Sequence, residues 1–355
     1  MDRSPARWVR PSIQALSAYQ VPDPGDAIKL DAMENPWAWP GELADAWLEA
    51  LRGLELNRYP DPAARELVQC LRECMGVPAD ASLLLGNGSD ELIQMLALAV
   101  AGPGRVILAP DPSFVLYRMV ADMTGMDFQA VPLAADFRLD RAAMLEAIER
   151  HQPAILFLAW PNNPTGTLFD LADMEALLEA APGLVVVDEA YAPFTDASLL
   201  PRVGQYPHLL VLRTLSKMGL AGLRLGYLAG PRDWLAEIDK TRLPYNINAL
   251  TQASVRFALQ RREILDRQAA QIREERERLF HALSALPGVT AWPSEANFIL
   301  FRVAGAQQVF EALRERGILI KYLGGLGGLL SDCLRVSVGT PEDNARFLGV
   351  LGDLL

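Results

Sequence analysis

The 355-residue sequence is 51% hydrophobic and carries a formal net charge of −11, from 44 acidic and 33 basic side chains. This length and apolar content suffice for one large and one smaller domain, and they exclude a mainly disordered chain. A surface with this much negative charge repels nucleic acid and anionic lipid. Neither is therefore expected as a partner. No segment reaches the roughly 18 apolar residues of a membrane span, and no signal-peptide pattern opens the chain. We therefore expect a cytoplasmic protein without membrane attachment.

Three cysteines, Cys70, Cys74 and Cys333, are too few to indicate a disulfide framework. Cys70 and Cys74 lie four residues apart in a segment with helical spacing, which would place them on one helix face. A metal site there is disfavoured, because no pair of histidines lies nearby. Reduced thiols and no metal are therefore expected, as is usual in cytosolic proteins.

Short apolar runs alternate with amphipathic stretches over the first two thirds of the chain. The amphipathic stretches include residues 90–100, 140–150 and 171–180. The expected strands are Leu83–Leu85, Val106–Ala109, Ala154–Ala159, Leu184–Val187, Leu209–Leu212 and Tyr227–Ala229. Continuous apolar strands that alternate with helices indicate a parallel sheet covered on both faces. The pattern predicts a three-layer α/β large domain with a mostly parallel sheet, formed by residues 29–245.

The pattern changes after about residue 230. Residues 250–286 combine helical spacing with many opposite charges and no helix breaker, which predicts one long helix. Beyond it, strands are expected at Asn297–Arg302, Ile318–Ile320 and Leu334–Val338, with a helix at Ala306–Arg316. This part predicts a smaller α+β domain, formed by residues 246–355 together with an N-terminal arm of residues 1–28.

Ligands bind beyond the carboxyl ends of the strands in an open parallel sheet, so the residues after each strand are the first candidates. Gly86–Glu91 (GNGSDE) follows the first strand and opens a helix, where small residues and the helix N-terminus suit a phosphate. An ordinary helix start capped by Ser89 or Asp90 is the plainer alternative. After the third strand, Asn162 and Asn163 stand between two prolines. A rigid amide there suits a ligand oxygen, although a simple turn has the same sequence.

Two charged residues follow the next two strands. Asp188 would be a costly carboxylate at the end of a buried strand unless it meets a cation, such as a protonated pyridine nitrogen; helix capping is the alternative. Lys217 follows Thr214 and Ser216, and Arg224 comes after it. A lysine withdrawn from water can form a Schiff base, while hydroxyls and a guanidinium suit a phosphate. In this order the signals predict a single ligand site.

Four segments that follow the predicted strands match signature sequences of a known family: PNNPTG at 161–166, VVVDEAY at 185–191, TLSK at 214–217 and GLAGLRLGY at 219–227. They resemble the fold type I aminotransferases, which use pyridoxal phosphate (PLP). The more specific resemblance is to histidinol-phosphate aminotransferases, and it extends from Leu16 to Asn344. It implies that the large sheet binds PLP.

The resemblance implies a role for each matching residue toward the cofactor. We expect Lys217, Asp188 and Tyr191 to be catalytic: Lys217 would carry PLP and move a proton, and Asp188 would keep the pyridine nitrogen protonated. Tyr191 and Asn163 would bond to the phenolic oxygen. Phe114 stands where relatives often have a stacking tyrosine, and it can stack without hydrogen bonding. The other expected cofactor-binding residues, mostly around the phosphate, are Gly88, Ser89, Asp90, Thr214, Ser216 and Arg224.

The resemblance also implies substrate contacts and a partner subunit. Arg335 would bind the anionic tail of the substrate, and Tyr19, Asn35 and Lys321 would add further contacts. For Lys321 a plain surface lysine is the alternative. Tyr59 would bind the cofactor phosphate of a neighbouring subunit, which implies a homodimer, although a turn aromatic is the plainer interpretation.

The activity that this resemblance implies is transfer of the amino group of L-histidinol phosphate to 2-oxoglutarate, giving imidazole-acetol phosphate and glutamate in histidine biosynthesis. Two alternatives on the same fold stay open: an aminotransferase for aromatic amino acids and a threonine-phosphate decarboxylase. The sequence departs from the family at two places. The linker over residues 217–224 is one residue shorter than in many relatives, which weakens the case for Arg224. Residues 324–328 are unusually rich in glycine, as a lid or a loose connection would be.

Overall fold

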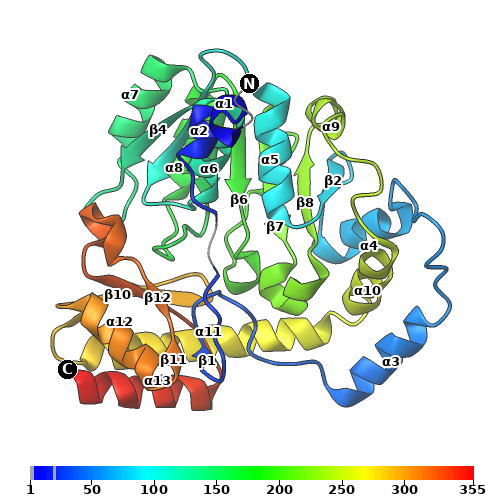
Figure 1. Cartoon of the computed structure of the whole chain (residues 1–355). Helices are drawn as coiled ribbons and strands as arrows, with labels where there is room; N and C mark the ends of the chain where they lie inside the picture. The colour runs from blue at the N-terminus through cyan, green and yellow to red at the C-terminus, as the bar shows by residue number, and fades with distance from the viewer. Residues whose placement is uncertain (1–3, 19–20) are drawn as a thin grey trace.

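A seven-stranded sheet forms the centre of the computed structural model, which describes residues 4–18 and 21–355 (Figure 1). Its strands are β2 (Ser82–Gly86), β3 (Val106–Asp111), β4 (Asp127–Pro132), β5 (Ile155–Ala159), β6 (Leu184–Asp188), β7 (Leu209–Thr214) and β8 (Gly226–Gly230). They lie in the order β2-β8-β7-β6-β5-β3-β4. The pairs from β7 to β4 are parallel, and β8 runs antiparallel to both of its neighbours. The expected mostly parallel sheet is confirmed.

Successive side chains of the central strands are buried on opposite faces of this sheet. In β5, Ile155 and Phe157 belong to one apolar cluster, whereas Leu156 and Leu158 belong to another, and none of the four is exposed. Both faces therefore need a cover of helices, which explains the continuous apolar runs in the sequence. One face packs against α5 (Ser89–Val100), α6 (Leu116–Thr124) and α9 (Arg232–Asp239). The other packs against α4 (Arg65–Met75), α7 (Arg141–His151), α8 (Leu171–Ala180) and α10 (Ala249–Leu259).

The edge strand β4 was not expected from the sequence. Its sequence, DFQAVP, mixes polar and apolar residues, and only Val131 is buried. A strand with one neighbour and one solvated edge needs no continuous apolar run, so it lacks the pattern that marks β5 and β6.

The single long helix expected over residues 250–286 is wrong, because the structure has two helices there. α10 ends at Leu259, and α11 (Glu263–Ala285) begins after a short turn. In that turn the Arg262 guanidinium donates to the carbonyl of Cys74 on α4. α10 packs against α4 and the large sheet, whereas α11 packs against the small sheet. The turn contains no proline or glycine, so tertiary packing is what divides the predicted helix into two.

A second, smaller sheet lies below the first in Figure 1, together with α11, α12 (Ala306–Glu315) and α13 (Pro341–Leu354). Its four antiparallel strands are β12 (Lys321–Tyr322), β13 (Cys333–Ser337), β10 (Phe298–Val303) and β9 (Val289–Ala291), in that order. The helix α13 begins with a capping box, in which Thr340 and Asp343 bond to each other's backbone nitrogen.

The chain segment before α3 (Gly41–Leu51) joins the small sheet to the large one. β1 (Ile28–Lys29) pairs in parallel with β11 (Ile318–Leu319). Next along the chain, Leu30 accepts a hydrogen bond from the Ser337 nitrogen at 2.8 Å, and the Met33 nitrogen donates to the Ser337 hydroxyl at 2.8 Å. Residues 30–33 are thereby attached to β13, and they extend toward the carboxyl ends of the large sheet.

The remaining helices are short or peripheral. α1 (Pro5–Trp8) and α2 (Pro11–Gln14) lie in the N-terminal arm, where Arg10 donates to the carbonyl of Met123 on α6. Within the described ranges 4–18 and 21–355, none of the helices has both the length and the apolar character that crossing a membrane requires.

Candidate active site

A cavity of about 380 Å³ lies at the carboxyl ends of β5, β6 and β7, where the large sheet meets the small one. In open parallel sheets this edge is where ligands bind. The predicted site residues that line the cavity are Ser89, Asp90, Phe114, Asn163, Asp188, Tyr191, Thr214, Ser216, Lys217, Arg224, Lys321 and Arg335. Residues from both sheets therefore converge on one space.

Besides Gly88, which is described below, three of the predicted residues do not line this cavity or cannot be placed. Tyr19 lies outside the described residues. The Asn35 amide instead donates to the Gln268 side chain at 2.9 Å, and its oxygen accepts from the Trp37 nitrogen. Tyr59 is 80% exposed at the molecular surface. Their substrate and partner roles stay predictions. The structure shows that the Asn35 side chain contacts α11 and does not line the cavity.

Asp188 forms the floor of the cavity at the end of β6, with 4% of its surface exposed. Its Oδ2 accepts a hydrogen bond from the Tyr117 hydroxyl at 2.8 Å, and its Oδ1 accepts one from the Ala190 nitrogen at 3.0 Å. Burial raises the pKa of Asp188 to about 6, although both hydrogen bonds act in the opposite direction. A buried carboxylate of this kind favours a cationic partner inside the cavity.

Lys217 lies in the turn after β7 and its amine faces the same cavity. Burial lowers the pKa of Lys217 to about 8, and the positive charge of Arg335 lowers it further, whereas Glu34 and Asp90 act in the opposite direction. The amine donates to the carbonyl of Ala32 at 3.1 Å. The lowered pKa makes far more of this amine neutral near pH 7 than is usual for a lysine, and the neutral form is the one that attacks a carbonyl.

Two hydroxyls and a guanidinium meet at one end of the cavity, beside the first turn of α5. The Thr214 hydroxyl donates to the Ser216 hydroxyl at 3.0 Å, and the Arg224 Nη1 donates to the same Ser216 oxygen at 3.4 Å. Ser89 opens α5 here, and Asp90 pairs with Arg224 at 3.4 Å. Hydroxyls, a guanidinium and a helix N-terminus together suit a phosphate. Arg224 reaches this end despite the short linker from Lys217.

Two glycines allow this close packing. Gly88 precedes α5 with a φ of +87°, and a Cβ there would lie 2.7 Å from the Arg224 guanidinium. A Cβ on Gly226 would lie 2.6 Å from the Ser89 nitrogen, so β8 passes close to the start of α5. Gly88 thus borders the phosphate end of the cavity without lining it.

The amide loop after β5 is held firmly beside the cavity. Asn162 is fully buried, and its amide donates to the Pro112 carbonyl at 3.0 Å. Its neighbour Asn163 accepts a hydrogen bond from the guanidinium of Arg335, which also donates to the Asp31 carbonyl at 3.0 Å. The loop is thus held by side-chain hydrogen bonds, and Arg335 connects it to the small sheet.

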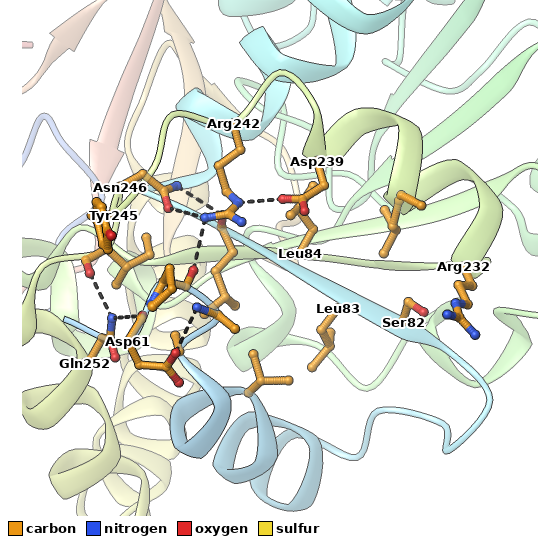
Figure 2. Close-up of a pocket in the computed structure, with 18 residues that line it drawn as sticks. Asp61, Ser82, Leu83, Leu84, Arg232, Asp239, Arg242, Tyr245, Asn246 and Gln252 are labelled. Atoms are coloured by element: carbon orange, nitrogen blue, oxygen red, sulfur yellow. Dashed lines mark hydrogen bonds and ion pairs between the residues drawn. The ribbon is translucent and has the colours of Figure 1, made fainter. Parts of the chain in front are cut away.

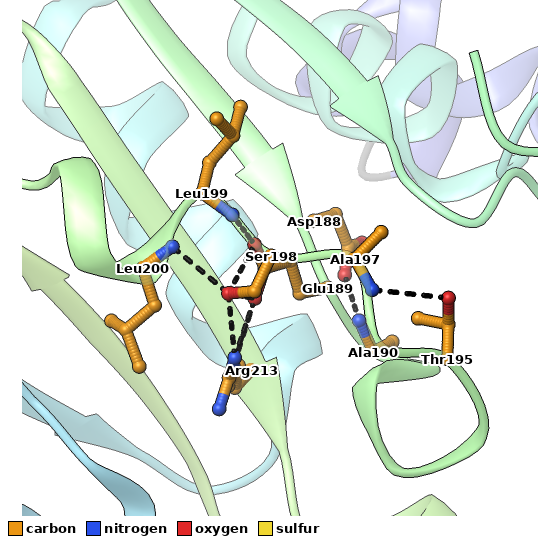
Figure 3. A network of polar contacts seen from close by, with 9 residues as sticks. All are labelled: Asp188, Glu189, Ala190, Thr195, Ala197, Ser198, Leu199, Leu200 and Arg213. Carbon is orange, nitrogen blue, oxygen red and sulfur yellow. Dashed lines mark hydrogen bonds and ion pairs between the residues drawn. The ribbon is translucent and has the colours of Figure 1, made fainter. Parts of the chain in front are cut away.

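A buried ion pair lies directly behind the cavity floor (Figure 3). Glu189 follows Asp188 and is 1% exposed, and its carboxylate pairs with Arg213 on β7 at 2.7 Å. The same carboxylate accepts hydrogen bonds from the Ser198 hydroxyl and the Leu199 nitrogen. The ends of β6 and β7, which carry Asp188 and Thr214, are therefore joined by side chains as well as by the sheet.

Sequence reasoning missed two contributions to the site. Asp31–Glu34 forms one wall of the cavity, because this segment is attached to β13. Its first three residues, Asp31–Met33, match no motif, and Glu34 only begins a segment that resembles the family, so the pairing with the small sheet is what reveals its place. Tyr117, beneath Asp188, lies three residues after Phe114, and this helical spacing was the one signal that could have identified it.

A second cavity, of about 280 Å³, lies along the edge strand β2 of the large sheet, between α4, α9 and the start of α10 (Figure 2). Arg242 crosses it and donates to Asp239 at 2.6 Å, to Asn246 at 3.3 Å and to the Pro62 carbonyl at 3.2 Å. Tyr245 stands at its border, stacked on Tyr59 with ring centres 4.4 Å apart. Here Asp61, Asp239 and Arg242 already have protein partners.

The first cavity fits an anionic aromatic aldehyde such as PLP. A lysine amine with a lowered pKa can hold the aldehyde, and the Asp188 carboxylate can pair with a ring nitrogen. The Thr214, Ser216 and Arg224 side chains can hold a phosphate. Among residues 4–18 and 21–355, no group of three or more His, Cys, Asp or Glu side chains has the arrangement of a metal site.

Comparison with known proteins agrees with this geometry. The aminotransferase class I and II family matches residues 26–351. Histidinol-phosphate aminotransferase 2 of Nitrosococcus oceani is 56% identical over 98% of this chain and 97% of its own length. Histidinol-phosphate aminotransferase 1 of Ralstonia nicotianae is 54% identical over 98% of this chain and 94% of its own.

A solved structure, histidinol-phosphate aminotransferase from Sinorhizobium meliloti in complex with pyridoxal-5'-phosphate, superposes with a TM-score of 0.86. It covers 97% of this chain and 96% of its own at 24% identity, so it shows a shared fold. The fold type I architecture expected from the sequence is thereby confirmed. The match to the aminotransferase class I and II family, which uses PLP, confirms the expected cofactor. The chain belongs to the aminotransferase class I and II family of PLP-dependent enzymes, and over nearly its whole length it is similar to histidinol-phosphate aminotransferases.

Proposed function

We propose that this enzyme transfers the amino group of L-histidinol phosphate to 2-oxoglutarate, a step of histidine biosynthesis. The observation that carries the proposal is the meeting of Lys217, Asp188 and Arg335 in one cavity. The first two suit amino transfer, and the third supplies a cation for a substrate phosphate. The names of relatives that are 48–56% identical point to the same substrate.

The chain's own residues have distinct roles in this proposal. PLP, when bound, supplies an electron-withdrawing ring that stabilises negative charge at the substrate Cα. Lys217 holds the cofactor and then moves the proton between the substrate Cα and the cofactor C4′. Asp188 keeps the ring nitrogen protonated, and Tyr191 and Asn163 bond to the phenolic oxygen. Phe114 packs on the ring.

The two ends of the cavity bind two different phosphates in this proposal. Ser89, Thr214, Ser216 and Arg224 hold the cofactor phosphate, with Gly88 and Asp90 shaping that end. At the opposite end, Arg335 on β13 and Lys321 on β12 are opposite neighbours in two adjacent antiparallel strands of the small sheet. Both side chains line the cavity, so together they bind the substrate phosphate.

This local arrangement resolves the conflict between an anionic substrate and an acidic protein. The cavity is lined by Lys217, Arg224, Lys321 and Arg335, and by four acidic residues. Its local charge is therefore balanced, in contrast to the formal net charge of −11 of the chain. Short-range pairing with buried cations outweighs the screened repulsion from distant surface charges.

The test is the visible absorbance of the PLP-loaded enzyme before and after L-histidinol phosphate is added without an oxo acid. We expect the cofactor band to convert to that of the aminated cofactor. Conversion by aromatic amino acids, with no response to histidinol phosphate, would favour the aromatic aminotransferase. Release of carbon dioxide from threonine phosphate, without any need for an oxo acid, would favour the decarboxylase.

We further propose that two copies of the chain form the working enzyme. Tyr59 is exposed and stacks on Tyr245, and the large apolar side chains of Leu56 and Leu243 are exposed nearby in sequence. Exposed apolar groups of this kind mark a face that binds a partner. Tyr59 would then bind the cofactor phosphate of the other subunit. Sedimentation of the full chain gives the mass that tests this proposal.

The domain division and the location complete the proposal. Residues 29–245 form the large domain, and residues 1–28 with 246–355 form the arm and small domain; β1 spans the first of these boundaries. We place the enzyme in the cytoplasm, in keeping with the free thiols of Cys70, Cys74 and Cys333.

A further inference from the structure

Beneath the cavity floor, one tyrosine contacts Asp188 without lining the cavity. We infer that Tyr117 is a positioning residue, whose hydroxyl keeps the Asp188 carboxylate ionised and turned toward the cavity. The inference rests on the proposed role of Asp188 toward the cofactor ring, and it names a residue through which that role is maintained.

The contact is a short hydrogen bond inside the protein. The Tyr117 hydroxyl lies 2.8 Å from Asp188 Oδ2, and the two residues are 0% and 4% exposed. An ionised carboxylate only accepts, so the phenol is the donor. Burial, followed by the negative charge of Asp188, raises the pKa of Tyr117 well above its usual value, so the donor keeps its proton.

Two donors fix the orientation of the carboxylate. Tyr117 holds Oδ2, and the Ala190 nitrogen holds Oδ1 at 3.0 Å. Each carboxylate oxygen can accept two hydrogen bonds, so both retain acceptor capacity toward the cavity. Without the phenol, Asp188 would be held by the backbone at one oxygen only, and its side chain could rotate.

The Tyr117 ring is itself held in place. It stacks on Phe157 of β5, with ring centres 4.4 Å apart and an angle of 2° between the planes. Phe114, which lines the cavity, meets it edge-on at 5.6 Å. Tyr117 is fully buried and is not among the residues that line the cavity, so it acts through Asp188.

The phenol also opposes the influences that raise the pKa of Asp188. Burial raises the Asp188 pKa most strongly, the Tyr117 and Ala190 hydrogen bonds lower it, and the charges of Asp90 and Glu189 raise it. Deleting the hydroxyl removes the largest of the influences that lower the Asp188 pKa. The Asp188 pKa then rises, and the carboxylate becomes protonated at a higher pH.

The experiment is to measure the dissociation constant of PLP for the apoprotein as a function of pH in the Tyr117→Phe variant. Affinity falls with falling pH as Asp188 is protonated. We expect the midpoint of this fall to move up by about one pH unit, with binding that approaches about tenfold weaker below both midpoints. A hydroxyl with a merely structural role would lower the melting temperature and leave this midpoint in place.

Tyr227→Phe is the matched control. Tyr227, on β8, is also fully buried, but its hydroxyl lies beside Arg213. Its loss should leave the midpoint unchanged. A second variant, Phe157→Leu, keeps the phenol but removes its stacking partner, and we expect a smaller shift in the same direction.

Asp188→Asn separates the two levels of the proposal. This variant should abolish the acidic fall in affinity. If it does so while Tyr117→Phe keeps the midpoint of the parent, the inference about Tyr117 is wrong and the role of Asp188 stands. If Asp188→Asn leaves the pH profile unchanged, Asp188 does not pair with the ring, and the inference fails together with the proposed role.

Discussion

The two cavities of this enzyme are similar in size and opposite in character. In the first, of about 380 Å³, Asp188 and Lys217 are withdrawn from water and their pKa values move toward neutrality, Asp188 upward and Lys217 downward, mainly through burial. In the second, of about 280 Å³, Asp239 is 44% exposed and pairs with Arg242. There the pKa of Asp61 is lowered, because the backbone nitrogens of Arg65 and Ala63 donate to it.

The difference in how their charged groups are paired and buried shows what makes a cavity reactive. Charged groups that already have partners gain little from a ligand, and their protonation states are fixed at physiological pH. Buried groups whose pKa values lie near 7 can exchange protons and accept a partner from outside. Volume alone does not distinguish the two spaces, whereas the state of their charges does.

Removing the amine of the first cavity should have the largest effect. Lys217→Ala should lower kcat/KM for amino transfer at least a thousandfold, about 4 kcal/mol of transition-state stabilisation, because no other group replaces its proton transfer. Steady-state assays with histidinol phosphate measure this loss, and circular dichroism checks the fold. A variant that keeps a tenth of the parent activity would contradict the mechanism.

A smaller effect concerns the pH at which the first cavity accepts PLP. A lowered pKa means that the Lys217 amine becomes neutral as pH rises through about 8, so the rate of PLP capture by the apoprotein should rise with that midpoint. Arg335→Gln removes a positive charge that contributes to the lowering, so the midpoint should move to higher pH. Stopped-flow absorbance gives both profiles.

Lys240→Gln provides the control for this pH profile, because Lys240 is exposed and pairs with Glu237 on the surface. Its midpoint should coincide with that of the parent. An Arg335→Gln profile that moves to lower pH would show that Arg335 is not a source of the lowered pKa.

The second cavity should give the smallest effect. Asp239→Asn removes a partly exposed ion pair with Arg242, so the free energy of unfolding should fall by about 0.5 kcal/mol and kcat/KM should stay within about twofold. Urea denaturation and steady-state assays measure these quantities. A large loss of activity would show that the second cavity also contributes to catalysis, and the two cavities would then not differ in function.

The large sheet was predictable because its strands are buried on both faces. Leu184–Asp188 consists of four consecutive apolar residues followed by an aspartate, and all five are buried in the structure. The edge strand Asp127–Pro132 lacks this pattern and was missed. The division between Leu259 and Glu263 was also missed, since it depends on packing against two different sheets and leaves no mark in the local sequence.

The site was predictable where one strand end carries one functional side chain. Asp188, Asn163 and Lys217 each follow a strand, and the rule for open sheets places them together. Asp31–Glu34 and Tyr117 could not be predicted in this way. The first reaches the cavity through a long-range pairing with β13, and the second lies on a helix whose contact with Asp188 depends on tertiary structure.

The hydrogen bond between the Lys217 amine and the Ala32 carbonyl has a mechanical consequence. Ala32 lies between Leu30 and Met33, which are both bonded to Ser337 of the small sheet, whereas Lys217 belongs to the large one. When the amine engages a cofactor or substrate atom instead, one tie between the two sheets is lost. The chemical state of a single nitrogen is therefore coupled to one contact between the two sheets.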